Sequence, residues 1–404
     1  MPALKDDSGF ACFLQTKMKR YCFFIANYLP NLGGVERYTL NLAKALQEKG
    51  IDSITIVTNN VFNLPAEETE KGIRIIRLPC FKLLDGRFPV PRLNKKFRSL
   101  YSKLQNDTFD FVIVQTRFYP HSLIGARFAK KKRIPCIVIE HGTSHFTVHN
   151  RFFDVAGHIY EHAETILLKR YTDSFFGVSQ ACNNWLRHFH ITAKGILYNS
   201  VNVDDIQRII HSSAYDYREK YGKGHSGIVC YAGRLVPEKG VRKLIEAVEL
   251  LNRESINVLL LVAGDGMLLN VLKKENHPDV IYLGKLDFDH VISLYHQSDV
   301  FCLPTDYPEG FPTTVLEAAA SDCYVIATEK GGSGELILSE EYGMILQENN
   351  AKNIAEAIKK AILDDKYRAS AIKKAYERVK NTFVWEKTSE KVIQIEKKMN
   401  NQSQ

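Results

Sequence analysis

The sequence lacks the long apolar segment that would cross a bilayer. No apolar run in its 404 residues approaches the roughly 20 residues of a membrane-spanning helix. Residues 21–29 are apolar but run into a glycine pair, and no small-residue cleavage site follows, so they predict a buried strand rather than a signal peptide. With 45% hydrophobic and 25% charged residues, the composition is typical of a soluble globular protein.

Paired cysteines are also missing. None of the eight cysteines forms a C-x-x-C pair, and most lie inside apolar, strand-like runs. Scattered thiols of this kind fit a reducing compartment, and they indicate neither a zinc site nor a disulfide framework. We therefore expect a cytoplasmic protein.

The chain has no short repeat, no low-complexity segment and no motif that combines aromatic and basic residues for nucleic-acid binding. Its net charge of +8 is unevenly placed, because residues 1–200 contain 28 Lys and Arg against 16 Asp and Glu, whereas residues 201–404 contain 26 against 30. A basic first half could meet nucleic acid, anionic lipid or a phosphorylated substrate. Without a binding motif, we expect no nucleic-acid partner.

Short apolar runs alternate with amphipathic stretches, which favours parallel sheets with crossover helices. The expected strands are 22–26, 54–58, 73–78, 111–115, 136–139, 174–178 and 195–198 in the first half, and 228–232, 258–263, 280–283, 300–303 and 324–327 in the second. The expected helices include 36–49, 92–104, 121–132, 242–252, 353–363 and 385–399.

This pattern predicts an α/β protein with two doubly wound parallel-sheet domains, whose ligands lie at the carboxyl ends of the strands. We expect a disordered extension at 1–17, a first domain at 18–200 and a second at 201–384. Residues 385–404 are expected to form a polar helix that could pack back on the first domain.

Both halves open with a strand that leads through a glycine-containing loop into a helix. In the first half Gly33 and Gly34 would let the backbone approach an anion at the helix N-terminus, although a tight packing turn explains them equally well. In the second half Arg234 and Lys239 flank the turn, and two cations there would hold a diphosphate. The alternative is a solvated basic loop.

The most specific segment is 304–318, which follows an apolar strand. Glu309 lies in the loop, Pro312 favours a helix start, and Glu317 lies about a turn and a half into that helix. Both carboxylates would therefore line one cleft at the sheet edge. A carboxylate accepts hydrogen bonds from two vicinal hydroxyls, which suits a ribose or a hexose.

Glu309 and Glu317, with seven residues between them in PEGFPTTVLEA, resemble the signature of the retaining glycosyltransferases of family 4, which have the GT-B fold. The likeness extends to residues 233–240, 263–266 and 331–337, and in the first half to 33–37 and 140–142. It covers about residues 20–385, and several motifs in the right order make coincidence implausible.

The resemblance implies two Rossmann-like domains, a nucleotide-sugar donor, a glycan or lipid-linked acceptor, and no cofactor. It implies catalytic roles for His141, Arg234, Lys239 and Glu309. It implies donor binding by Gly33, Gly34, Arg234, Lys239, Gly264, Leu286, Glu309, Gly310, Phe311, Pro312, Thr313 and Glu317. In this scheme Arg234 and Lys239 bind the phosphates, Glu317 binds the ribose, and Glu309 and His141 approach the transferred sugar.

One segment departs from the family. After Glu317 the chain reads AAASDCY, where the family more often has Ala-x-Ala-x-Gly-x-Pro. This places Asp322 at the usual glycine and loosens the turn into the next strand. The nucleotide-site geometry is the feature that the departure would affect.

Metal chemistry has two weak signals. Asp287 and Asp289 form an Asp-x-Asp, but they precede a helix and are better explained as its cap. His158 and His162 are four apart on an expected helix, among other histidines at 141, 145 and 149, yet Glu161 is misplaced for an H-E-x-x-H zinc motif. We therefore expect no metal site.

A membrane partner is a separate hypothesis. From Arg92 to Leu104, apolar residues share one helical face with basic residues around it, and a basic run from Lys130 to Arg133 lies nearby. Such a helix can lie on an anionic bilayer, here the inner face of the plasma membrane. The alternative is a domain helix that packs its apolar stripe inward.

The nucleotide (uridine or guanosine), the sugar and the acceptor stay open, and acceptor recognition is assigned to first-half loops such as 143–157. Surface polysaccharide or glycolipid synthesis is the expected context. A GT-B nucleotide-sugar epimerase would use the same cleft without an acceptor. A non-catalytic basic binding module would leave Glu309 and Glu317 unexplained.

Overall fold

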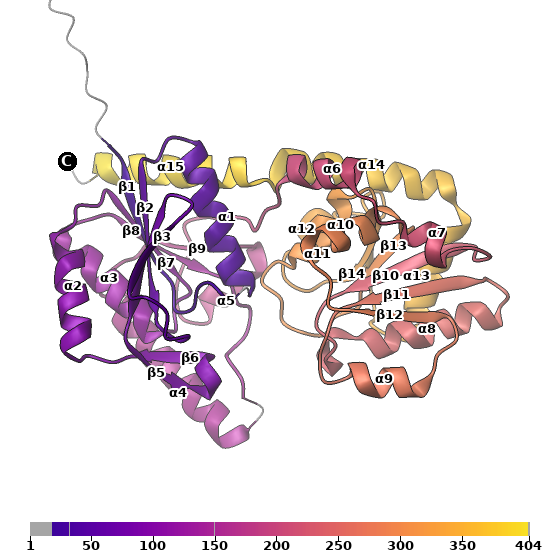
Figure 1. Cartoon of the computed structure of the whole chain (residues 1–404), viewed down its shortest axis with the longest axis horizontal. Coiled ribbons are helices and arrows are strands. Elements are labelled where there is room, and N and C mark those ends of the chain that lie inside the picture. Colours follow the sequence, from indigo (N-terminus) through magenta and orange to yellow (C-terminus); the bar gives the residue numbers. More distant parts are fainter. Residues whose placement is uncertain (1–17, 32, 149, 403–404) are drawn as a thin grey trace, which may run out of the picture.

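The computed structural model describes residues 18–31, 33–148 and 150–402, so the expected extension 1–17 lies outside the described residues. Two α/β domains lie side by side, and each is built around one sheet (Figure 1). This arrangement confirms the predicted fold class of two doubly wound domains.

The sheet of the first domain has the strand order β3-β4-β2-β1-β7-β8-β9. All of its pairings are parallel except β3 with β4. The central strands are buried throughout, which explains their continuous apolar sequences. The strands are β1 (Arg20–Phe24), β2 (Ser53–Asn59), β3 (Glu67–Glu70), β4 (Ile73–Leu78), β7 (Phe111–Gln115), β8 (Cys136–Glu140) and β9 (Phe175–Gly177), and a separate hairpin contains β5 (Cys80–Leu83) and β6 (Phe88–Pro91).

The sheet of the second domain is parallel, with the order β12-β11-β10-β13-β14-β15. The chain order reverses beside β10, at the point where open α/β sheets bind ligands. The strands are β10 (Gly227–Ala232), β11 (Val258–Ala263), β12 (Val280–Gly284), β13 (Val300–Leu303), β14 (Tyr324–Thr328) and β15 (Met344–Leu346).

Helices cover both sheets (Figure 1). In the first domain they are α1 (Gly34–Glu48), α2 (Lys95–Asn106), α3 (Pro120–Lys132), α4 (Arg151–Leu168) and α5 (Gln180–Arg187). The second domain contains α6 (Val203–Ser212), α7 (Tyr217–Tyr221), α8 (Val241–Arg253), α9 (Leu269–Glu275), α10 (Phe288–His296), α11 (Thr313–Ala320), α12 (Ser333–Leu336), α13 (Ala351–Leu363) and α14 (Asp365–Thr382). None of the helices in the described ranges is long and apolar enough to span a membrane.

The last helix, α15 (Trp385–Gln402), returns to the first domain and packs against α1 (Figure 1). Lys49 at the end of α1 pairs with Glu386 at 2.7 Å and with Glu390 at 2.8 Å. The chain enters the second domain near Val201 and returns to the first domain near Val384, and a β-bridge joins these two residues. The C-terminal helix therefore links the domains.

Several local predictions were wrong. Residues 195–198 form a single bridge from Ile196 to Gly177 rather than a strand. The helix expected from Arg92 begins at Lys95, because Asn94 caps it by accepting a hydrogen bond from Phe97 N at 2.9 Å. The acceptor loop expected at 143–157 ends at Asn150, where α4 begins.

Candidate active site

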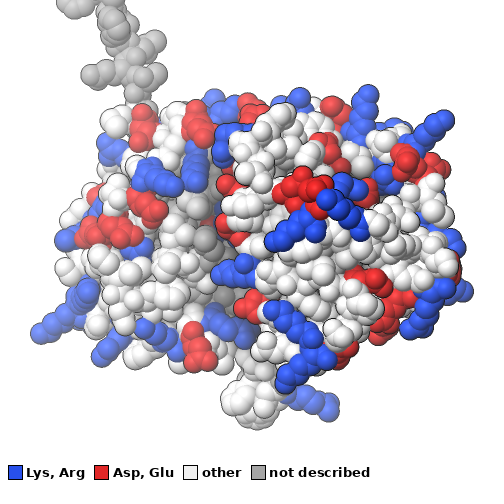
Figure 2. Space-filling view, turned by 45° about the vertical axis from the view of Figure 1, so that its right-hand side comes forward, with Lys and Arg blue, Asp and Glu red and all other residues white. Residues whose placement is uncertain are grey.

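A hollow of about 350 Å³ lies between the domains. On the side of the first domain it is lined by residues at the carboxyl ends of β1, β7 and β8 and by the start of α1, including Gly34 and His141. On the other side the loop 307–311 after β13 contributes Glu309, Gly310 and Phe311. The space-filling view shows a furrow between the two lobes with basic side chains along it (Figure 2).

A second hollow of about 550 Å³ opens at the carboxyl ends of β10 and β11. Four predicted donor-binding residues line it, namely Arg234, Gly264, Leu286 and Glu317. Arg37 of α1 reaches it from the other domain. Eight of the twelve predicted donor-binding residues therefore line one of these two hollows, and the four that line neither are Gly33, Lys239, Pro312 and Thr313.

Lys239 and Glu309 form an ion pair, and the side chain of each is 13% exposed. The ring of Tyr307 lies beside both predicted phosphate-binding cations, with Lys239 Nζ at 5.1 Å and Arg234 Cζ at 5.6 Å from its centroid. Distances of this size allow cation–π attraction. The loop 307–311 therefore brings Arg234 and Lys239 together at the ring of Tyr307.

Glu317 lies on α11 with 7% of its surface exposed. Loss of hydration raises its pKa to about 7, and the nearby Arg37 opposes the shift. A carboxyl group in this state titrates near neutral pH. Its position in the second hollow fits a partner that offers hydroxyl groups rather than a second anion.

The loop 307–311 is bound to the first domain through its backbone. The carbonyl oxygen of Glu309 accepts a hydrogen bond from Thr143 Oγ1 at 2.9 Å, and that of Gly310 accepts one from Ser179 Oγ at 2.7 Å. The carbonyl oxygen of Phe311 accepts one from Asn199 Nδ2 at 2.9 Å. Three consecutive residues of the signature are thus held across the domain boundary.

Two glycines permit close backbone approaches. A Cβ atom on Gly310 would lie 2.0 Å from the carbonyl oxygen of His141, so only glycine allows this contact between the domains. Gly264 has a φ of +140°, and a Cβ atom there would lie 1.9 Å from the carbonyl oxygen of Gly233. The backbone geometry therefore requires glycine at both positions.

The two predicted glycines, Gly33 and Gly34, differ in their position relative to the hollows. Gly34 starts α1, lines the first hollow and has open space where a Cβ atom would be. Gly33 precedes the helix and lines neither hollow, and a Cβ atom on it would lie 2.5 Å from the carboxylate of Glu36. Only Gly34 is therefore placed to approach a ligand.

His141 has a fixed, uncharged ring. Its Nε2 lies 2.7 Å from Gln115 Oε1, which can only accept, so the ring donates this hydrogen bond. Burial lowers the pKa of His141 to about 3. The edge-to-face contact with Tyr38, at 4.7 Å between centroids, also orients the ring. His141 can thus accept a hydrogen bond from a sugar hydroxyl group at Nδ1, but it cannot supply a positive charge.

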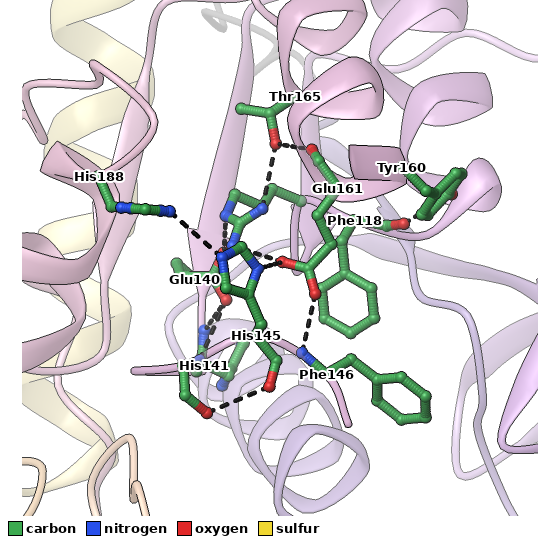
Figure 3. A network of polar contacts seen from close by, with 12 residues as sticks. Phe118, Glu140, His141, His145, Phe146, Tyr160, Glu161, Thr165 and His188 are labelled. Atoms are coloured by element: carbon green, nitrogen blue, oxygen red, sulfur yellow. Dashed lines mark hydrogen bonds and ion pairs between the residues drawn. The ribbon is translucent and has the colours of Figure 1, made fainter. Parts of the chain in front are cut away.

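A buried charge network supports His141 (Figure 3). Glu140 Oε1 accepts hydrogen bonds from the backbone N–H groups of His141 and Gly142, each at 3.0 Å. Arg117 lies 3.0 Å from Glu140 and 3.1 Å from Glu161. Arg117 was not predicted from the sequence, because nothing in its local pattern distinguishes it from a surface arginine.

The remaining predicted residues lie at the start of α11 or in turns. Pro312 is the cap of α11, and Thr313 lines a groove beside Glu317. Asp287 caps α10 by accepting a hydrogen bond from His290 N at 2.9 Å, which accounts for the Asp-x-Asp. Asp322 replaces the family's usual glycine with a φ of +58°, a conformation that Asp tolerates better than most residues.

The sequence predicted no individual role for Arg37, Tyr307, Ser179 or Asn199, and Thr143 was included only as part of the loop expected to recognise the acceptor. Arg37 was part of a motif that we quoted, and Tyr307 lies within the signature segment, so both had a signal. The three hydrogen-bond donors are ordinary polar residues, and only the assembled cleft identifies them.

Two facing parallel-sheet domains with this cleft define a glycosyltransferase of the GT-B type. A model of the glycosyl transferases group 1 matches residues 215–378, and a model of glycosyltransferase family 4 matches residues 32–205. The chain belongs to the group 1 glycosyltransferases.

Individual proteins agree with this assignment. An uncharacterised glycosyltransferase of Methanocaldococcus jannaschii, MJ1069, is 26% identical over 376 residues, which cover 90% of this chain and 95% of that protein. The capsular polysaccharide biosynthesis glycosyltransferase CapM of Staphylococcus aureus is 31% identical over 180 residues, or 42% of this chain and 47% of that protein. The crystal structure of Anabaena HepE with UDP superimposes with a TM-score of 0.70 and 17% identity over 94% of this chain and 99% of that one.

Proposed function

We propose that this glycosyltransferase moves a hexose from a UDP- or GDP-sugar to a hydroxyl group of a glycan or lipid-linked acceptor, with retention of anomeric configuration and without a metal ion at the diphosphate. The observation that carries the proposal is the convergence of Arg234, Lys239 and Glu309 at Tyr307, beside the hollow that contains Glu317. HepE, which shares the fold, was solved with UDP and with UDP-glucose.

The charges explain how the reaction would proceed. Transfer passes through an oxocarbenium-like centre while negative charge grows on the departing diphosphate, and Lys239 and Arg234 would stabilise that charge. A phosphate that takes the place of Glu309 on Lys239 frees this carboxylate to accept hydrogen bonds from the sugar hydroxyls. With no evident nucleophile, we assign front-face attack assisted by the leaving phosphate.

A lipid-linked acceptor is favoured by a third, apolar hollow of about 300 Å³ next to the first. Phe118 and Phe146 line both hollows, so one molecule could occupy both. Exposed apolar side chains on α4, among them Phe152, Phe153 and Ile159, continue from this hollow. The tip of α4 projects lowest in Figure 1 and belongs to a mostly uncoloured lower part of Figure 2.

The sequence predicted a membrane contact on α2, and we now propose that α4 makes this contact instead. The apolar side chains Phe97, Leu100 and Leu104 of α2 are buried in the domain core, so the stripe packs inward. Lys132, in the basic run that ends at Arg133, donates to backbone carbonyl groups at the end of α2. We propose that α4 and the β5–β6 hairpin meet the lipid, and vesicle sedimentation with and without anionic lipid tests this.

The decisive experiment is a thermal-shift screen against UDP- and GDP-sugars, followed by a nucleotide-release assay with acceptor. A donor at one hundred times its dissociation constant should stabilise the folded state by about 2.7 kcal/mol. Glu309→Ala and Lys239→Ala should abolish turnover and keep the fold, whereas Lys243→Ala, which alters an exposed lysine of α8 paired with Asp306, should remain active. Turnover in Lys239→Ala at the wild-type rate would refute the proposed site.

Product analysis tests the remaining points. The anomeric configuration of the product, read by NMR, should match that of the donor. Conversion of a nucleotide sugar in the absence of acceptor would instead favour an epimerase. Addition of Mg²⁺ or Mn²⁺ is expected to leave turnover unchanged, and a requirement for either ion would contradict transfer without a metal ion at the diphosphate.

A further inference from the structure

Three histidines from separate segments converge outside the donor site. His145 lies in the loop between β8 and α4, His162 lies on α4, and His188 follows α5. One ring nitrogen of each histidine lies within 4.8 Å of those of the other two, and no other such group of potential ligands occurs in residues 18–31, 33–148 and 150–402. We propose that His145, His162 and His188 bind one Zn²⁺ ion, with the fourth coordination position open to water.

The orientation of His145 supports this site. Its Nδ1 lies 3.0 Å from Glu161 Oε2, so Nδ1 carries the proton and Nε2 presents a lone pair. A histidine that donates one ring N–H to a carboxylate while the other nitrogen binds the metal is the usual arrangement in zinc proteins. Glu161 is itself fixed by Arg117 at 3.1 Å and by Phe146 N at 2.8 Å.

The spacing also fits. His145 Nε2 lies 3.2 Å from His188 Nε2, with the two rings facing each other in Figure 3. Two nitrogens bound at 2.0–2.1 Å to a tetrahedral ion are about 3.3 Å apart. The greatest separation of 4.8 Å in the group leaves shifts of about 1.5 Å for the third ring, which a rotamer adjustment supplies.

Aromatic packing holds two of the rings in place. Trp185 stacks on His188 with an interplanar angle of 8°, and His158 stacks on His145 at 3.9 Å between centroids. His188 is exposed at the surface, so an ion can reach the site from solvent. The rings of the cluster are thus fixed by stacking and are accessible to ions from solvent.

A metal ion here would fix the position of the surrounding loop and helices and would not contact the reacting atoms. It would tie the loop after β8 to α4 and to the end of α5. The same loop contains Thr143, which donates to the carbonyl oxygen of Glu309, and His145 lines the first hollow. The ion would therefore steady the acceptor side of the cleft.

The test uses the full chain without a histidine tag. After dialysis against a chelator, the protein is titrated with Zn²⁺ in competition with a chromophoric indicator, and with Co²⁺ to record the visible bands of a tetrahedral ion. One ion per chain is expected. His188→Gln and His162→Gln should each weaken binding at least tenfold, while His211→Gln on α6 should bind as the wild type does.

Two outcomes of the titration would overturn the proposal. Absence of binding at stoichiometric Zn²⁺, or equal affinity in His188→Gln and the wild type, would show that His145 and His188 share only a hydrogen bond. Because His188 is exposed, its replacement should leave the core intact, and circular dichroism checks this. The donor thermal shift is measured on the same samples, so failure of the metal site is distinguishable from failure of the proposed enzyme.

Discussion

Replacing Glu317 with glutamine would measure the free-energy cost of burying an ionised carboxyl group in the second hollow. Burial raises the pKa of Glu317 from 4.5 to about 7, so the unfolded chain releases this proton at a lower pH than the folded chain does. Between these two values the folded state binds more protons. Stability must therefore fall as pH rises from 4.5 to about 7, and the loss is complete above that window.

The size of the effect follows from the two pKa values. The interval from 4.5 to about 7, at 1.36 kcal/mol per pH unit, corresponds to roughly 3 kcal/mol lost by pH 8. Glutamine cannot ionise, so Glu317→Gln should escape this loss. The melting temperature of Glu317→Gln minus that of the wild type should therefore be roughly 6–12 °C larger at pH 8 than at pH 4.5, as expected for a domain of this size.

Thermal unfolding followed by circular dichroism at pH 4.5 and pH 8 provides the assay. Comparing the two pH values cancels any packing difference between glutamate and glutamine. Glu246→Gln, at an exposed position of α8, is the matched control and should show no such pH dependence. If the difference between Glu317→Gln and the wild type is the same at both pH values, the carboxyl group titrates normally and the reasoning is wrong.

Three further predictions concern the interdomain face. Gly310→Ala should lower kcat at least tenfold without unfolding either domain, because its Cβ atom would lie 2.0 Å from the opposing backbone. Arg117→Leu leaves two buried carboxylates without their cation, so we expect a loss of about 3–5 kcal/mol, seen as a lower melting temperature. His141 should show no change in its ¹³C ring shifts between pH 5 and pH 8, since its pKa of about 3 keeps it neutral; a titration in that range would contradict its burial.

The sequence predicts the parts of the fold that depend on local patterns. Buried parallel strands such as β7 and β11 are continuous apolar runs, so they were located to within about a residue. The hairpin of β5 and β6 was missed because β5 is mostly exposed and carries little apolar periodicity. A helix was expected at His158 and His162, but the start of α4 at Arg151 was missed, because the preceding loop was expected to continue to residue 157.

Contacts between distant segments could not be predicted in the same way. The signature identified Glu309 and Glu317, but the donors that hold its loop come from three places in the first domain. The histidine pair at 158 and 162 was judged by its own spacing, whereas the structure joins His162 to His145 and His188. Local spacing identifies a ligand pair on one helix, and it says nothing about ligands that a fold brings together.

Under the proposed function, the ion pair between Lys239 and Glu309 would let one cleft serve both the free enzyme and its donor. Each charge is largely removed from water, so each would be costly without a partner. When a diphosphate takes Lys239, the carboxylate of Glu309 needs new hydrogen-bond donors, and the hydroxyl groups of the transferred sugar can supply them. A donor that lacks its sugar would leave Glu309 unpaired in a nearly dry site. Recognition of the phosphate and recognition of the sugar are thus coupled through a single exchange of partners, which favours the intact nucleotide sugar over the free nucleotide.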